Sequence, residues 1–290
     1  MQRHLIVGYD GSRVATAAAD WAADEAVRRQ ASLTIVGCFT VPVMTDYGIA
    51  SPVVSPRELE SIRHGVQQRL DDVANELAAT RPGLSVNACA IQGRARHELV
   101  EQAEHADLLV IGSSGTGDSP MYLFGSVAHA LIRNSPCPVV LVPGTRPLPD
   151  RPNIVVAIDG TPRCQAAIDW ATDEADLLHG RLTIAHVWSY PYGDATMPSE
   201  ARDLTRVDAA LHLEQAVDKA RTRGGTDVQG LLLEGDAEAE VAATGFSADL
   251  VVLGTHRPRR FGLFPIGSVT YSMIARATCP IVLVNEPSQE

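Results

Sequence analysis

Lysine is almost absent from this chain, and its scarcity excludes two large classes of phosphate-handling enzyme. Lys219 is the only lysine among 290 residues, and it falls in a segment expected to be helical. A P-loop requires a lysine beside its terminal Ser or Thr, and a protein kinase requires one on a strand. The chain is therefore neither a P-loop NTPase nor a protein kinase.

Several other catalytic and structural motifs are missing. The sequence has no G-x-S-x-G elbow and no G-x-G-x-x-G dinucleotide loop, and its nine histidines show no H-x3-H spacing. We therefore expect no metal site built from side chains. The five cysteines are odd in number and form no C-x2-C pair, so we expect no disulfide framework, with Cys137 and Cys279 as buried thiols.

Positive charge and long apolar runs are also scarce. The formal net charge is -11 and the pI is near 5.3, which argues against binding to nucleic acid or to an anionic membrane surface. No apolar run approaches the roughly 20 residues of a membrane span, and the amino terminus shows no signal-peptide pattern. These features predict a soluble, cytoplasmic protein.

An internal repeat organises the chain. The triplet at Asp10 recurs at Asp159, and the helical motif at Trp21 recurs at Trp170, with the same offset of 149 residues. Later landmarks repeat with an offset of 142, so the second copy lacks seven residues between its second and third strands. We expect two domains, at 1–146 and 150–290, and we expect both tryptophans to pack in the cores.

Within each copy, apolar strands alternate with amphipathic helices. In the first copy, apolar runs at 4–9, 33–39, 84–90, 108–111 and 139–142 predict strands, and residues 13 onward, 56–77, 95–105 and 126–134 predict helices. Near-continuous apolar strands indicate a parallel sheet covered on both faces. The fold class is α/β, with two doubly wound parallel-sheet domains in tandem.

Two loops in the first copy lie where such a fold binds ligands, beyond the carboxyl ends of the strands. Asp10 to Ser12 follows the first strand, and Gly112 to Ser126 follows the fourth. Glycines let backbone N–H groups approach a phosphate, and a helix start adds partial positive charge. Asp10 and Ser12 can also serve simply to cap the following helix.

The glycine pattern carries a family resemblance. Gly112, Gly115, Gly125 and Ser126 match G-x2-G-x9-G-[ST], and together with the Asp-Gly-Ser turn they make the chain resemble the ATP-binding members of the universal stress protein family. The likeness covers essentially the whole chain, as two family domains in tandem. It implies a Rossmann-like fold of the adenine nucleotide alpha-hydrolase type that binds ATP with Mg²⁺.

The resemblance also implies a site in the first domain. Asp10, beside Gly8, would face the adenosine, Val41 the adenine, and the glycine loop with its helix start the phosphates. The full expected set is Gly8, Asp10, Val41, Gly112, Ser113, Ser114, Gly115, Thr116, Gly117, Gly125, Ser126 and Val127.

The second copy departs from this pattern. Arg257, followed by Pro258, replaces the second glycine, and both residues obstruct a backbone that needs positive φ or a close approach. The alternative is that Arg257, Arg259 and Arg260 contact phosphate themselves. The candidate residues are Asp159, Gly254, Thr255, His256, Arg257, Gly267, Ser268 and Val269.

Three functions remain open. The favoured one is an ATP-binding regulator of stress response or growth, in which nucleotide biases conformation or the choice of a protein partner. The rivals are a slow ATP hydrolase or nucleotidyl transferase, with at most weak ATPase activity, and a nucleotide-free interaction module. The resemblance also suggests a homodimer.

Overall fold

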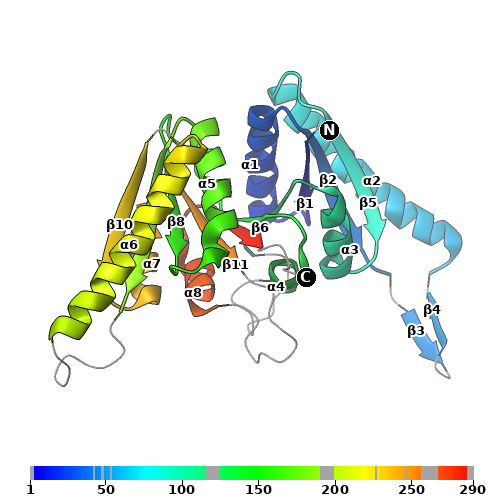
Figure 1. Ribbon diagram of the computed structural model, residues 1–290. Coiled ribbons are helices and arrows are strands. Elements are labelled where there is room, and N and C mark those ends of the chain that lie inside the picture. The colour runs from blue at the N-terminus through cyan, green and yellow to red at the C-terminus, as the bar shows by residue number, and fades with distance from the viewer. Residues whose placement is uncertain are drawn as a thin grey trace. The chain divides into compact units, whose positions relative to one another are not determined.

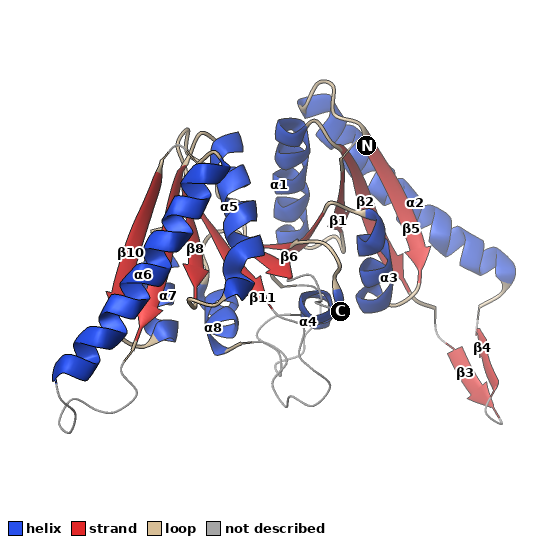
Figure 2. Ribbon diagram, viewed as in Figure 1, coloured by secondary structure: helices blue, strands red, loops and turns tan. Residues whose placement is uncertain are grey.

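The computed structural model describes residues 3–41, 43–46, 49–52, 54–114, 125–189, 199–225, 227–245, 247–255 and 267–285. The chain divides into two compact units, Met1–Gly144 and Thr145–Glu290. Each unit is a parallel sheet with helices on both faces, as Figures 1 and 2 show. The expected fold class, two tandem doubly wound α/β domains, is confirmed.

The first unit contains one five-stranded parallel sheet in the order β5-β2-β1-β6-β7 and a separate antiparallel hairpin of β3 and β4. Its elements are β1 His4–Gly8, α1 Arg13–Arg29, β2 Ser32–Phe39, β3 Val43–Asp46, β4 Ile49–Pro52, α2 Pro56–Thr80, β5 Val86–Gln92, α3 Ala95–Gln102 with a 3₁₀ turn Ala103–His105, β6 Leu108–Gly112, α4 Ser126–Asn134 and β7 Val139–Val142.

The second unit repeats this arrangement, in the order β10-β9-β8-β11-β12. Its elements are β8 Asn153–Ile158, a 3₁₀ turn Pro162–Cys164, α5 Gln165–Leu177, β9 Arg181–Trp188, α6 Ser199–Arg223, β10 Val228–Glu234, α7 Ala237–Gly245, β11 Leu250–Thr255, α8 Ser268–Arg276 and β12 Ile281–Asn285.

The central strands are buried on both faces, as the continuous apolar runs predict. Leu5, Val7, Leu109, Val110 and Val140 are all 0% exposed. Helices α1 and α2 pack on one face of the first sheet and α3 with α4 on the other. This double cover explains why the strands show no alternation of polar and apolar residues.

Helix α2 begins at a capping box formed by Ser55 and Glu58. Ser55 Oγ accepts a hydrogen bond from Glu58 N at 3.3 Å, and Glu58 Oε2 accepts one from Ser55 N at 2.7 Å, with Pro56 at the first helical position. This reciprocal pair satisfies two amides that a helix start otherwise leaves unpaired. Leu70, Ala74 and Leu77 are buried, whereas Ile62, on the face that the helical spacing predicts to be buried, is 38% exposed.

Four local features differ from the sequence-based expectations. The strand expected over 84–90 is β5, at Val86–Gln92. Residues 43–46 and 49–52 form the β3–β4 hairpin, where no strand was expected. The helix expected over 95–105 ends at Gln102 and closes in a 3₁₀ turn. Trp21 is 7% exposed and lies in the core, whereas Trp170 is only half-buried.

The hairpin also accounts for most of the length difference between the repeats. Sixteen residues connect β2 to α2, and ten connect β9 to α6. The following helix-to-strand connection is one residue shorter in the second unit. The seven missing residues therefore lie in loops, where the sheet is not disturbed.

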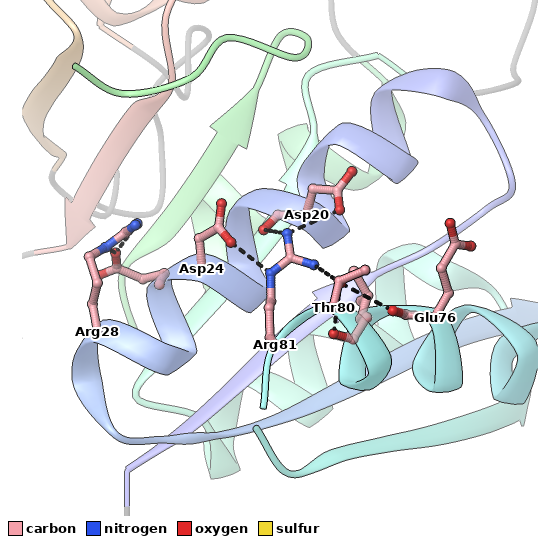
Figure 3. Close-up of polar contacts among 8 residues, drawn as sticks. Asp20, Asp24, Arg28, Glu76, Thr80 and Arg81 are labelled. Carbon is pink, nitrogen blue, oxygen red and sulfur yellow. Dashed lines mark hydrogen bonds and ion pairs between the residues drawn. The ribbon is translucent and has the colours of Figure 1, made fainter. Parts of the chain in front are cut away.

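Arg81, directly after α2, forms hydrogen bonds and ion pairs with side chains of α1 in the first unit (Figure 3). Its Nε donates to Asp24 Oδ1 at 2.6 Å, and its Nη2 donates to Asp20 Oδ1 at 3.2 Å. The second unit repeats the arrangement, because Arg223 contacts Asp173 and Asp169, the counterparts of Asp24 and Asp20. The repeat thus preserves a specific ion-pair network that joins two helices.

Candidate functional site

The candidate loops of the first unit meet at its topological switch point. Strands β1 and β6 are neighbours, with Val7 opposite Val110, and the strand order runs outward in opposite directions from this pair. The Asp10 turn follows β1, and the segment beginning at Gly112 follows β6. Both therefore open at the same carboxyl edge, where doubly wound folds bind their ligands.

The Asp-Gly-Ser turn is held by its own side chains. Asp10 Oδ1 accepts from Ser12 N at 2.9 Å, and Ser12 Oγ accepts from Ala15 N at 3.1 Å, which caps α1. Gly11 adopts φ +83°, a conformation that side-chain-bearing residues rarely take. Asp10 is exposed, so its carboxylate can support the turn and still accept hydrogen bonds from a ligand.

Gly8 and Gly112 have packing reasons for lacking a side chain. A Cβ on Gly8 would lie 2.9 Å from Leu99 Cδ1, and a Cβ on Gly112 would lie 2.9 Å from Val14 Cγ2 and 3.0 Å from its carbonyl carbon. Gly112 thus lets the first turn of α1 approach the end of β6. Both glycines shape the edge on which the site is built.

The start of α4 offers backbone amides at this edge. Gly125 is its N-cap, with φ -60° and ψ 159°, and no acidic side chain lies in the first turn. Ser126 is exposed at the first helical position, and Val127 is half-buried. First-turn amides, a hydroxyl and the helix dipole together suit an anionic group.

The other described residues of the expected first site follow the carboxyl ends of β6 and β2. Ser113 N donates to Val142 O at 2.9 Å, which extends the pairing of β6 with β7, and Ser114 is exposed. Val41 is half-buried two residues after β2. Gly115, Thr116 and Gly117 lie outside the described residues, as do His256 and Arg257 of the second site.

Asp159, the counterpart of Asp10, accepts hydrogen bonds from two neighbouring residues. Its Oδ1 accepts from Thr161 N at 2.9 Å, Thr161 Oγ1 at 2.6 Å and Cys164 Sγ at 3.1 Å. Burial raises the pKa of Asp159, but hydrogen bonds from Thr161 and Cys164 outweigh burial and hold that pKa below its ordinary value. The acceptor oxygen of this carboxylate is already occupied within the chain.

Two histidines fill the space beside the second turn. A Cβ on Gly160 would lie 3.0 Å from His186 Cε1 and 3.1 Å from His212 Nδ1, whereas a Cβ on Gly11 would meet no atom of the described residues within 4 Å. The two imidazole centroids are 6.4 Å apart. Burial and the neighbouring His212 lower the pKa of His186, so the neutral ring is favoured there.

The remaining residues of the second site lie in positions like those of the first. Gly254 and Thr255 end β11, and the nearest atom to a Cβ on Gly254 is Ala167 Cβ at 3.7 Å, an ordinary contact. Gly267 is the N-cap of α8, Ser268 is exposed, and Val269 is half-buried. The helix start is thus repeated, and the Asp turn is the part that differs.

Sequence reasoning missed Cys164, His186 and His212 as members of the second site. His186 lies on β9 and His212 on α6, and only the pairing of β9 with β8 brings them to Gly160. One signal was present, because the repeat aligns His186 with Gly37 of the first copy and Cys164 with Ala15. When a small residue of one repeat is replaced by a cysteine or histidine at the same position of the other, the two sites have diverged in chemistry.

Other parts of the described structure have fewer features of a binding or catalytic site. A hollow of about 240 Å³ is lined by Ala26, Val27 and Gln30 of the α1 end and by residues 82–85, but it lies at the amino edge of the sheet. Over the described ranges, no three His, Cys, Asp or Glu side chains are arranged to hold a metal ion. No described helix has the length and hydrophobicity needed to cross a bilayer.

The comparisons with known proteins agree with this tandem architecture. A family model described as "Universal stress protein family" matches residues 1–143 and 151–285. The chain belongs to the universal stress protein family. Because the model matches twice, each half of the chain is a universal stress protein domain.

Relatives with the same tandem length come from mycobacteria. Universal stress protein Rv2005c of Mycobacterium tuberculosis is 27% identical over 289 residues, covering 98% of each chain. Universal stress protein Rv2623 of the same organism is 28% identical over 294 residues, covering 97% of this chain and 96% of that protein. A universal stress protein from Archaeoglobus fulgidus shares the fold, with a TM-score of 0.73 and 17% identity over 98% of both chains.

Proposed function

We propose that this universal stress protein binds ATP in its first domain and acts as a nucleotide-dependent regulator. The observation that carries the proposal is that the exposed Asp10 carboxylate and the Gly125–Ser126 start of α4 lie at the same carboxyl edge of the sheet. A carboxylate can accept from ribose hydroxyls, and first-turn amides can donate to phosphates. Mg²⁺ would be held largely by the phosphates and water, since Asp10 offers one carboxylate.

The second domain is proposed to bind ATP weakly or not at all. Asp159 accepts hydrogen bonds from Thr161 and Cys164. His186 and His212 fill the space beside Gly160, whereas no described residue fills the equivalent space beside Gly11. Arg257 in place of a loop glycine points the same way. From the family resemblance we also propose that the two domains span 1–146 and 150–290. We further propose that the protein forms a homodimer, binds a protein partner and acts in the cytoplasm.

A charge placed at the helix start tests the proposal. Ser126→Glu puts a carboxylate in the first turn of α4, which stabilises a helix but repels phosphate. Calorimetric titration with Mg·ATP should show at least about a tenfold loss of affinity, the cost of about 1.4 kcal/mol. Ser268→Glu, the matched change at α8, should leave the affinity unchanged. Equal affinity in Ser126→Glu and the wild type would rule out this site.

The same samples separate a regulator from an enzyme. Chromatography of the nucleotide after prolonged incubation should return ATP if the protein only binds it. Steady release of phosphate that is lost in Asp10→Asn would instead support the slow hydrolase. An unchanged melting temperature with ATP would leave the interaction module as the remaining function.

A further inference from the structure

Helix α6 carries apolar side chains on the face opposite the sheet. Leu204, Val207 and Leu211 are 70%, 64% and 49% exposed, and their spacing places them on one side of the helix. The buried side of the same helix is formed by Ala209, Leu213, Ala216, Val217 and Ala220. We call Leu204, Val207 and Leu211 the outer strip; α6 is the long yellow-green helix of Figure 1.

The repeat shows that the fold does not require an apolar outer strip. Helix α2 has the same length of 25 residues, and the positions equivalent to the outer strip are Ser61, His64 and Gln68. Both helices pack on their sheets through the other face. A run of exposed apolar side chains that one repeat has and the other lacks points to an interaction surface.

The charges one helical turn from the outer strip have one sign. The charged residues three or four positions from its members are Glu200, Asp203, Asp208 and Glu214, and all four are exposed. The other neighbours at these distances are Ala201, Ala210 and Gln215, so no cation lies one turn from the strip. The exposed Arg206 directly precedes Val207, and His212 Nδ1 lies 3.7 Å from Asp208 Oδ2. Two copies of this face would bring carboxylates together, whereas a cationic partner would neutralise them.

We propose that the outer strip of α6 binds a basic amphipathic helix of a partner protein. The partner helix would present apolar side chains at i, i+3 and i+7 to Leu204, Val207 and Leu211, with Lys or Arg on both flanks. Three anchors bury less than the roughly 800 Å² per partner of a standard interface, so the complex is weak and sensitive to salt. This surface is independent of the proposed ATP site.

A synthetic helix of leucine and lysine provides the probe. We would label an 18-residue amidated peptide with leucines at i, i+3 and i+7 and lysines on its flanks, and titrate it with the full chain by fluorescence anisotropy. The triple variant Leu204→Ser, Val207→His, Leu211→Gln, which installs the α2 residues, should bind at least about tenfold more weakly. The double variant Asp203→Asn, Asp208→Asn should also weaken binding and flatten its salt dependence.

Matched controls separate the strip from general charge attraction. Ile62→Ser removes the exposed apolar residue of α2 and should leave peptide binding unchanged. The triple variant should keep its melting temperature and its affinity for ATP, because its substitutions are exposed and lie on the outer face of α6. Loss of peptide binding with an unchanged melting temperature would support this inference whatever the fate of the proposed ATP site.

Four results would overturn the inference. The triple variant could bind the peptide as the wild type does, or a peptide with glutamate in place of lysine could bind equally well. Sedimentation could show that the wild type is a dimer and the triple variant a monomer, which would assign the outer strip to contact with a second copy of this chain. Vesicles of phosphatidylcholine could bind the wild type and not the variant, which would assign it to lipid.

Discussion

Thr161 Oγ1 donates a hydrogen bond to Asp159 Oδ1 at 2.6 Å, whereas its counterpart Ser12 uses its hydroxyl to accept from the backbone of α1. The same turn therefore serves two purposes in the two repeats. In the first, the hydroxyl caps a helix and Asp10 faces solvent. In the second, the hydroxyl binds the carboxylate, and α5 begins only after a 3₁₀ turn.

This asymmetry predicts unequal effects of one substitution at two equivalent positions. Asp10→Asn should weaken ATP binding by about tenfold or more, because a hydrogen bond to a charged acceptor contributes about 1.5–3 kcal/mol. Asp159→Asn should leave the affinity unchanged. Isothermal titration of both variants makes the comparison, and equal losses at the two positions would contradict the assignment of binding to the first domain.

Much of the fold could be predicted from the sequence because it depends on local patterns. Helix α2 starts at Pro56 as expected, since its capping box and apolar spacing lie within the segment itself. The β3–β4 hairpin was missed because each strand has four residues, and β4 ends in Pro52. Such short strands show too little alternation to separate them from a loop.

The candidate site was predictable only in part, for a related reason. Gly112 and Ser126 belong to a motif of fixed spacing, Asp10 belongs to the Asp-Gly-Ser turn, and the two loops follow neighbouring strands. His186 is 26 residues from Gly160, and their proximity arises from the register of β8 with β9. No local pattern encodes that contact, so the filling of the second turn emerged only from the structure.

The arginine that joins two helices should contribute more to stability in the first unit. The Arg81 side chain is 16% exposed and that of Arg223 is 42% exposed. Arg81→Ala should cost about 1–2 kcal/mol, as expected for a part-buried group with several hydrogen bonds. Arg223→Ala should cost less than about 1 kcal/mol, because exposed ion pairs contribute little. Urea unfolding measures both, and a larger loss in Arg223→Ala would contradict this account.

His186 should make the protein less stable in acid. Burial and His212 lower its folded pKa below the ordinary 6.5, against smaller opposing effects of the Ala209 backbone, Asp159 and Asp208. The unfolded chain then binds more protons, so stability is full above pH 6.5 and falls as pH drops through the folded pKa. His186→Gln should show a smaller drop in melting temperature from pH 7.5 to 5.5.

The control for this pH effect is His64→Gln, which removes an exposed histidine from α2. Its melting temperature should fall on acidification as much as that of the wild type. A pH profile of His186→Gln that matches the wild type would show that His186 does not titrate in this range.

One thiol should react much faster than the others. None of the five cysteines, all within the described ranges, forms a disulfide, and Cys89 is the exposed one. Cys137, Cys164 and Cys279 are buried, and burial raises the pKa of Cys38 to about 11, with smaller contributions from Glu98 and Cys89. A brief maleimide pulse and peptide mapping should find label on Cys89, and Cys89→Ser should abolish the rapid phase. Rapid labelling at Cys38 would contradict the burial of that side chain.

The number of ATP molecules per chain tests the central claim most directly. Native mass spectrometry of the full chain in saturating Mg·ATP should show one nucleotide per chain. At an ATP concentration near the wild-type Kd, Ser126→Glu should carry clearly less nucleotide than the wild type. Two nucleotides per chain, or occupancy that is unchanged in Ser126→Glu and reduced in Ser268→Glu, would contradict the assignment of binding to the first domain alone.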